Sequence, residues 1–391
     1  MRQEDSKERF STTIHIKLDT VLLAFIPVLF IICSILLIQD EGNSSIKDLS
    51  KVTEDGWHYV RMYDAKKNDE YIVITEYTGK NTDVVKIPGY IENLPVRVLK
   101  GHLIQYGSKY TEFVIPSEVE LMSGPIFSFA YIDKITFESG SRLKKIDGDQ
   151  ALGMHNVEEI ILPDGVEYIS RGAFAYSFDL KKLHIGPNVK EIGDGAFYAT
   201  KISVIDINEE NEYFEYKDGF LINKQEKKLL TYDHDRYEKE ITIPDYIREI
   251  DKETLDGSRL EIINVDERNK DYSSINGCLY SKDGRILYKV PEAMQQEDFE
   301  FAEGVESLEQ YSMRDNVFLQ EIKIPDSVKN IEMFALPDHD IYISKSLQSA
   351  DLQVFHGKVF FSGDEEDWKK IYIINSMPEN SVDYEVIFVE D

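Results

Sequence analysis

Cysteine is nearly absent from this chain. Only Cys33 and Cys278 occur in 391 residues, and no Cys-x-x-Cys pair is present. Two thiols cannot build the disulfide framework of a small secreted scaffold, and paired cysteines that could hold zinc are missing. Cys278 takes the place that Phe220 has in a preceding repeated unit, so we expect a buried apolar side chain rather than a reactive thiol.

Catalytic motifs are missing as well. The sequence has no G-x-S-x-G, no G-x-x-x-x-G-K-[ST] and no H-E-x-x-H. The densest histidine settings are Asp233-His234-Asp235 and Asp338-His339-Asp340, which lie between predicted strands and are typical of solvated turns. The acidic run 364–367 could offer oxygen ligands to calcium, but it lacks the glycine and the alternating spacing of an EF-hand loop. We therefore predict no catalytic residue, no cofactor and no metal site, with calcium at this run as the alternative.

Positive charge is scarce relative to negative charge. Lys and Arg number 44 against 73 Asp and Glu, which gives a net charge of −29. A chain this acidic repels nucleic acid and anionic lipid head groups. We predict no nucleic-acid partner, and we expect any basic partner to be steered toward the protein electrostatically.

Charged residues are absent from residues 21–38, an apolar stretch of eighteen residues. As a helix it would be about 27 Å long, close to the hydrocarbon thickness of about 30 Å. We predict a transmembrane helix at residues 20–38, a cytoplasmic tail at 1–19, where four basic residues lie, and an external linker at 39–54. The alternative is a cleaved secretory signal, although no small-residue cleavage site follows the stretch.

A repeat dominates the rest of the chain. A phrase of two alternating apolar residues, a turn, a Val or Ile, another Ile and Ala-Phe recurs 23 residues apart, in the pairs Leu162/Ile185, Val166/Val189, Ile169/Ile192 and Phe174/Phe197. Each phrase predicts one short strand, a turn and a second apolar edge. One such unit cannot bury its apolar residues alone, but stacked units form a continuous core.

A longer unit lies within this array. Residues 202–250 match residues 260–308 at a constant offset of 58, and Asp218-Gly219 and Asn276-Gly277 are typical of tight hairpin turns. We predict a solenoid at residues 84–358 that contains both units. Because the ends of a solenoid expose strand edges, we also predict an N-terminal β cap at 55–83 and a C-terminal cap at 359–391.

The repeated phrase resembles the I-x-I-P-x-x-V-x-x-I-x-x-x-A-F pattern of BspA-like leucine-rich repeats. Departures such as Ala151-Leu152 and Thr254-Leu255 in the place of Ala-Phe keep apolar side chains there. The resemblance implies a β-rich, right-handed solenoid of the leucine-rich-repeat type, with turns of about 23 residues, here preceded by a single transmembrane helix. It also implies a surface protein that adheres to host molecules or other cells, without naming a ligand.

The outward residues of the predicted strands should line up in a row, because each lies between two inward apolar residues. The least charged stretch of this row is the candidate contact face: Val114, Thr136, Ile161 and His184. The alternative is that outward β-branched residues merely suit a strand. Tyrosine side chains could also bind a glycan by stacking on its sugar rings, but no row of tyrosines repeats at the spacing of the turns.

Together these features predict a non-catalytic, membrane-anchored protein of the cell surface that binds an extracellular protein or glycan. Two alternatives remain: an extracytoplasmic enzyme that uses the solenoid as a scaffold, with its site in the 58-residue units, and a passive surface spacer.

Overall fold

The computed structural model describes residues 44–46, 50–80, 83–233, 239–295, 297, 299–337, 339–352, 357–374 and 385–389. The predicted transmembrane helix at 20–38 lies outside these ranges, as does His234. Within them, no helix is both long enough and apolar enough to cross a membrane.

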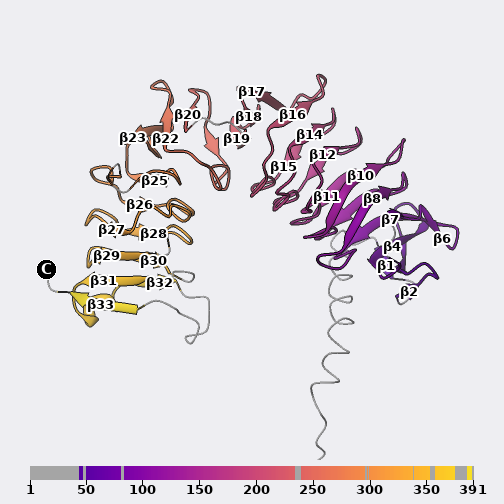
Figure 1. Cartoon of the computed structure of the whole chain (residues 1–391), viewed down its shortest axis with the longest axis horizontal. Helices are drawn as coiled ribbons and strands as arrows, with labels where there is room; N and C mark the ends of the chain where they lie inside the picture. The colour runs from indigo at the N-terminus through magenta and orange to yellow at the C-terminus, as the bar shows by residue number, and fades with distance from the viewer. Residues whose placement is uncertain are drawn as a thin grey trace, which may run out of the picture.

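The described chain winds into a β-solenoid of about 13 turns that curves into an arch, with the N-terminal strands at one foot and β33 at the other (Figure 1). A turn of the regular array contributes two short strands, and each strand pairs in parallel with its counterpart in a neighbouring turn. The strands therefore form two rows that follow the arch.

The outer row is made of the first strands of the turns, which lie on the outer side of the arch (Figure 1). It contains β5 (Val84–Lys86), β8 (Lys109–Ile115), β10 (Tyr131–Phe137), β12 (Glu159–Ile161), β14 (Lys182–Ile185), β16 (Val204–Ile207), β20 (Glu240–Ile243), β22 (Ile262–Val265), β27 (Glu321–Lys323), β29 (Asp340–Ser344), β31 (Lys358–Ser362) and β33 (Glu385–Val389).

The inner row is made of the second strands, most of which are only two or three residues long. It contains β7 (Leu94–Lys100), β9 (Leu121–Ser123), β11 (Lys145–Asp147), β13 (Tyr168–Ile169), β15 (Glu191–Ile192), β19 (Lys228–Tyr232), β21 (Glu249–Ile250), β25 (Ile286–Lys289), β26 (Ser307–Leu308), β28 (Asn330–Ile331), β30 (Ser349–Asp351) and β32 (Tyr372–Ile374). The sequence predicted only an apolar edge here, because strands this short show no alternation.

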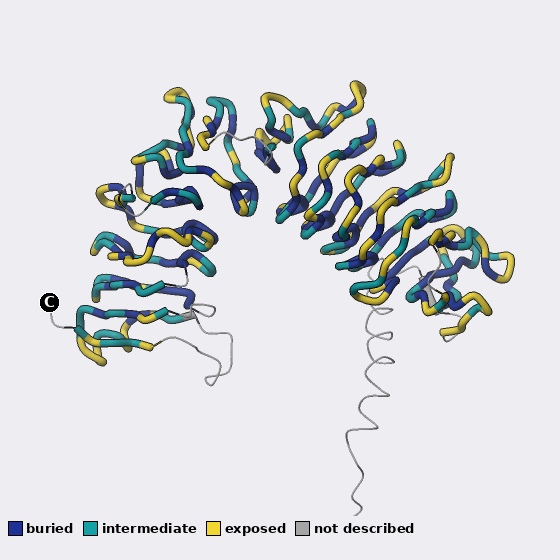
Figure 2. Tube along the Cα trace, viewed as in Figure 1, coloured by how far each residue is buried: buried dark blue, intermediate teal, exposed yellow. Residues whose placement is uncertain are grey.

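Buried residues follow the inside of the described turns, and exposed residues concentrate at the bends (Figure 2). Most of the buried residues are apolar. Along β14, Leu183 and Ile185 are buried while the residues between and before them are not, as the alternation predicts. The Ala-Phe positions are also buried: Phe174 and Phe197 stack with ring centroids 5.6 Å apart and planes 2° apart. The predicted core positions are confirmed.

The N-terminal foot is an antiparallel hairpin of β3 (Trp57–Asp64) and β4 (Asp69–Tyr77), which continues through β7 into the inner row. The short strands β1 (Ser44–Ile46) and β2 (Lys51–Val52) pair with β3, and β6 (Tyr90–Ile91) pairs with β7. At the other foot, the helix α2 (Glu365–Trp368) follows β31.

Each 58-residue unit adds a β-hairpin near the top of the arch: β17 (Phe214–Lys217) with β18 (Phe220–Asn223), and β23 (Tyr272–Ile275) with β24 (Cys278–Ser281). Asp218 and Gly219 have φ of 54° and 82°, and Asn276 and Gly277 have φ of 51° and 77°. Two successive positive φ angles are the geometry of a type I′ turn, which Asp-Gly and Asn-Gly favour. Both predicted hairpin turns are present.

Candidate functional site

The candidate contact face is divided between two sheets. Thr136 on β10 lies opposite Val114 on β8, and His184 on β14 lies opposite Ile161 on β12. The strands β10 and β12 belong to different sheets, however, and the nearby Tyr131–His155 bridge links the start of β10 only to the chain ahead of β12. The structure thus places the four residues on one row but separates them into two pairs.

A groove of about 940 Å³ lies where β10 and β12 are not paired. The buried side chains of Ile135 and Leu162, together with the partly buried Phe137, provide its apolar lining. Thr136 and Ile161 line it as well. The centre of the predicted contact face is therefore a groove rather than a flat strand surface.

The four face residues differ in how freely they meet solvent. Ile161 is 61% exposed, whereas Val114, Thr136 and His184 are partly buried. The Thr136 hydroxyl donates a hydrogen bond of 2.5 Å to Glu112 Oε1. Ile161 is thus the large apolar side chain that the face presents to a partner.

His184 is held by two carboxylates. Its Nε2 lies 2.9 Å from Glu159 Oε1, and its Nδ1 lies 2.8 Å from Asp206 Oδ2. His184 therefore orders the acidic side chains beside the groove rather than reaching outward.

A row of aromatic rings from successive turns borders the bridge between β10 and β12. Tyr131 stacks on His155 with centroids 4.8 Å apart, and His155 stacks on Phe178 at 5.6 Å. Tyr131 and Phe178 are each 38% exposed. A search for repeated tyrosines does not reveal this row, because its spacings of 24 and 23 residues join three residue types: Tyr131, His155 and Phe178.

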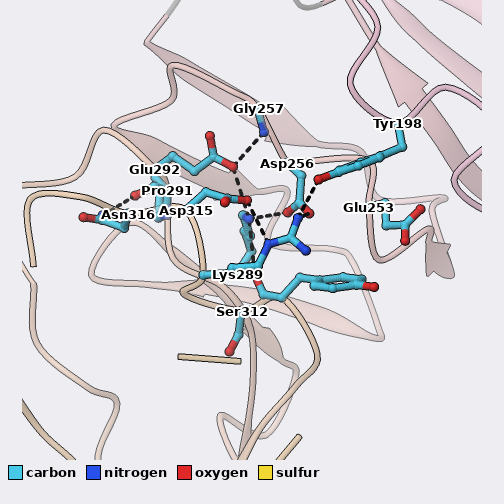
Figure 3. Close-up of polar contacts among 12 residues, drawn as sticks. Tyr198, Glu253, Asp256, Gly257, Lys289, Pro291, Glu292, Ser312, Asp315 and Asn316 are labelled. Atoms are coloured by element: carbon cyan, nitrogen blue, oxygen red, sulfur yellow. Dashed lines mark hydrogen bonds and ion pairs between the residues drawn. The ribbon is translucent and has the colours of Figure 1, made fainter. Parts of the chain in front are cut away.

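A second feature, the apex charge cluster, joins charged side chains of several turns through the polar contacts drawn in Figure 3. It comprises Asp256, Lys289, Glu292, Arg314 and Asp315. The buried Lys289 Nζ lies 2.5 Å from Asp256 Oδ1 and 3.4 Å from Glu292 Oε1. Arg314 donates to Asp256 Oδ2 at 2.9 Å and also contacts Asp315.

Burial controls the electrostatics of this cluster. It raises the pKa of Glu292 to about 7, and it raises the pKa of Asp256 against the lowering effect of the Lys289 ammonium group. The carboxylates of Asp256, Glu292 and Asp315 come within 4.8 Å of one another, a spacing that could suit a metal ion. Lys289 and Arg314 already place positive charge between them, so the arrangement is an internal ion-pair network.

Three members of successive units meet at this point. Tyr198, Asp256 and Arg314 are each 58 residues apart, and Arg314 bonds to both Asp256 Oδ2 and the Tyr198 hydroxyl at 2.9 Å. The 58-residue offset therefore continues just outside the two units and brings three equivalent positions together. The sequence analysis did not extend the offset to these residues, although the same spacing would have revealed them.

The other residues that the sequence singled out have structural roles where the structure describes them. In the Asp338–Asp340 triplet, Asp340 Oδ1 accepts a hydrogen bond of 3.1 Å from the Lys358 backbone N–H. In the acidic run, Asp364 caps α2 by accepting from the Asp367 backbone N–H at 2.8 Å. Cys278 is buried as predicted, and burial raises the pKa of its thiol to about 12.

With the fold and these sites described, the comparisons place the chain among known proteins. The model of the BspA type leucine rich repeat region matches in six copies, at residues 103–219 and 291–376. The chain belongs to the BspA-type leucine-rich repeat family. No protein of curated function matches its sequence.

Two solved structures are similar to this BspA-type chain. One is a leucine rich cell surface protein from Faecalibacterium prausnitzii, with 17% identity and a TM-score of 0.45, over 85% of this chain and 99% of the other. Another is the pneumococcal vaccine antigen PcpA, with 15% identity and a TM-score of 0.39, over 89% of this chain and 100% of the other. At these values the family assignment depends on the repeat match.

Proposed function

We propose that this BspA-type protein is displayed on the cell surface, is anchored by a helix at residues 20–38, and binds an extracellular protein or glycan without catalysing a reaction. The observation that supports this proposal most directly is the groove between β10 and β12, with the exposed Ile161 at its side. Exposed apolar residues rimmed by polar groups are typical of contact sites.

The proposed contact face is the groove side of the outer row: Val114, Thr136, Ile161 and His184. Acidic and hydroxyl groups surround Ile161, which matches the polar rim and apolar centre of a protein interface. We expect Ile161 to contribute most of the apolar contact.

Capture by full-length protein in detergent tests this proposal. Beads carrying the parent protein are incubated with extracellular-matrix and cell-surface polymers, and the bound material is measured. Ile161→Glu should lower capture about fivefold or more, the scale of an interface hot spot, with an unchanged unfolding curve. Val317→Glu introduces the same charge at a site that is 63% exposed and far along the chain, and should bind like the parent. Equal capture by Ile161→Glu and the parent would eliminate this face.

A further inference from the structure

The outer row has an open edge on each side of the groove. The strand β10 pairs with β8, and β12 pairs with β14, so the edges that β10 and β12 turn toward each other are unpaired; only Tyr131, at the start of β10, bridges to His155, which precedes β12. Within the described chain, no backbone hydrogen bond joins residues 134–137 to residues 159–162. Strand edges of this kind pair readily with a further extended segment.

The lining of the groove combines apolar and charged side chains. Its inner lining is apolar, with Ile135, Phe137 and Leu162. Its polar lining contains five carboxylates and a single ammonium group, namely those of Asp133, Glu138, Glu158, Glu159, Asp164 and Lys134. Lys134 pairs with Glu112 at 3.0 Å. Glu158 and Glu159 pair with Lys181 and Lys182 at 2.8 and 2.9 Å, so the negative charge of the groove rests mainly on Asp133, Glu138 and Asp164.

We propose that the groove between β10 and β12 binds an extended, basic peptide segment, which adds to the open strand edges with apolar residues inward and basic residues outward. This inference rests on the proposed surface-interaction function and specifies the partner for its contact face. Successive side chains of a strand point to opposite sides, so such a peptide would meet the apolar and the acidic linings alternately.

The aromatic row at the bridge fits the same partner. Lys109 Nζ lies 5.5 Å from the centre of the Tyr131 ring, so a cation is already accommodated on this row. The Phe178 ring, 38% exposed, offers a second face to an arginine or lysine of the partner. The net charge of −29 would also speed the approach of a basic segment.

Fluorescence anisotropy with synthetic peptides tests the proposal on full-length protein in detergent. The probe is a labelled six-residue peptide that alternates arginine and valine. The first control has the same composition with three arginines followed by three valines, and the second has methylated backbone nitrogens. The alternating probe should bind about threefold or more tightly than either control, because only it satisfies both linings and both strand edges. Equal affinity for all three peptides would show charge attraction alone and would overturn strand addition.

Variants locate the binding site. Glu138→Gln with Asp164→Asn removes two groove carboxylates and should weaken the alternating probe about threefold or more, given the small worth of each surface ion pair. Glu209→Gln with Glu210→Gln removes the same charge from exposed residues outside the groove lining, and should leave binding unchanged. An equal loss in both double variants would overturn the site.

The glycan alternative is measured in parallel with chitohexaose, a neutral oligosaccharide. If the protein binds chitohexaose but not the peptides, and Ile161→Glu abolishes this binding, the peptide proposal is overturned while the interaction function stands. If Ile161→Glu captures polymers as well as the parent does, the contact face itself fails, whatever the peptides do.

Discussion

Truncation of Phe174 is the sharpest test of the stacked core. The Phe174 side chain is 0% exposed and its ring lies flat against Phe197, so alanine removes buried apolar contact and leaves a cavity between two turns. Replacing a buried phenylalanine by alanine costs about 3–5 kcal/mol. Because a repeat contacts mainly its neighbours, we expect the loss to concentrate in the turns at residues 150–200.

Phe178→Ala provides a matched control on the same turn. This ring is 38% exposed, so its removal should lower the free energy of unfolding by about 1–2 kcal/mol, clearly less than the loss at Phe174. Hydrogen exchange followed by mass spectrometry measures both effects by position, since a long repeat array need not unfold in one step. Equal loss of protection in the two variants, or a loss spread evenly over the chain, would contradict the solenoid core described here.

Three further predictions concern buried charge and topology. Lys289→Met should destabilise the protein by about 3–5 kcal/mol in thermal or urea unfolding, because Asp256 and Glu292 would lose their buried partner. Burial raises the pKa of Asp251 from 3.8 to about 6, so between these pH values the folded state binds more protons than the unfolded state. The free energy of unfolding should therefore fall as the pH rises from about 4 to 6. Asp251→Asn should flatten this slope, and an unchanged slope would argue against the raised pKa of Asp251. Full-length protein should stay in the membrane fraction after an alkaline wash, because the apolar stretch at 20–38 is not released by charge screening.

The sequence predicted those parts of the fold that repeat. Inward residues such as Leu183 and Ile185 follow a two-residue period, and Phe174 and Phe197 follow the 23-residue period, so both periods could be found in the sequence. The turns at Asp218-Gly219 and Asn276-Gly277 were equally clear, because few other dipeptides favour two positive φ angles. These elements were predictable because they depend on residues that are close together in the sequence.

Features that depend on how turns sit against one another were not predictable in the same way. The unpaired stretch between β10 and β12 arises from the spacing of two strands whose sequences both look regular. The partnership of Lys289 with Asp256 joins residues 33 apart, a separation that matches neither repeat period. A buried lysine is costly without a partner, but the sequence alone could not show which carboxylate compensates it.

The interruptions at the top of the arch have a mechanical consequence. The inner row is not paired between β15 and β19 or between β21 and β25 in the part of the chain that the structure describes. The apolar core is likewise divided: each arm has one large cluster, the N-terminal hairpin has a small one of its own, and a further small cluster lies around Leu255 and Ile263. If the two feet were pulled apart, we expect the arch to bend at this small central cluster while both arms stay wound, because the pairing of the inner row is interrupted on both sides of it and side-chain contacts such as Lys228–Asp194 and Arg314–Tyr198 bridge the gaps instead. The distance between the two feet would then increase under load by bending at the top of the arch, without unwinding either arm.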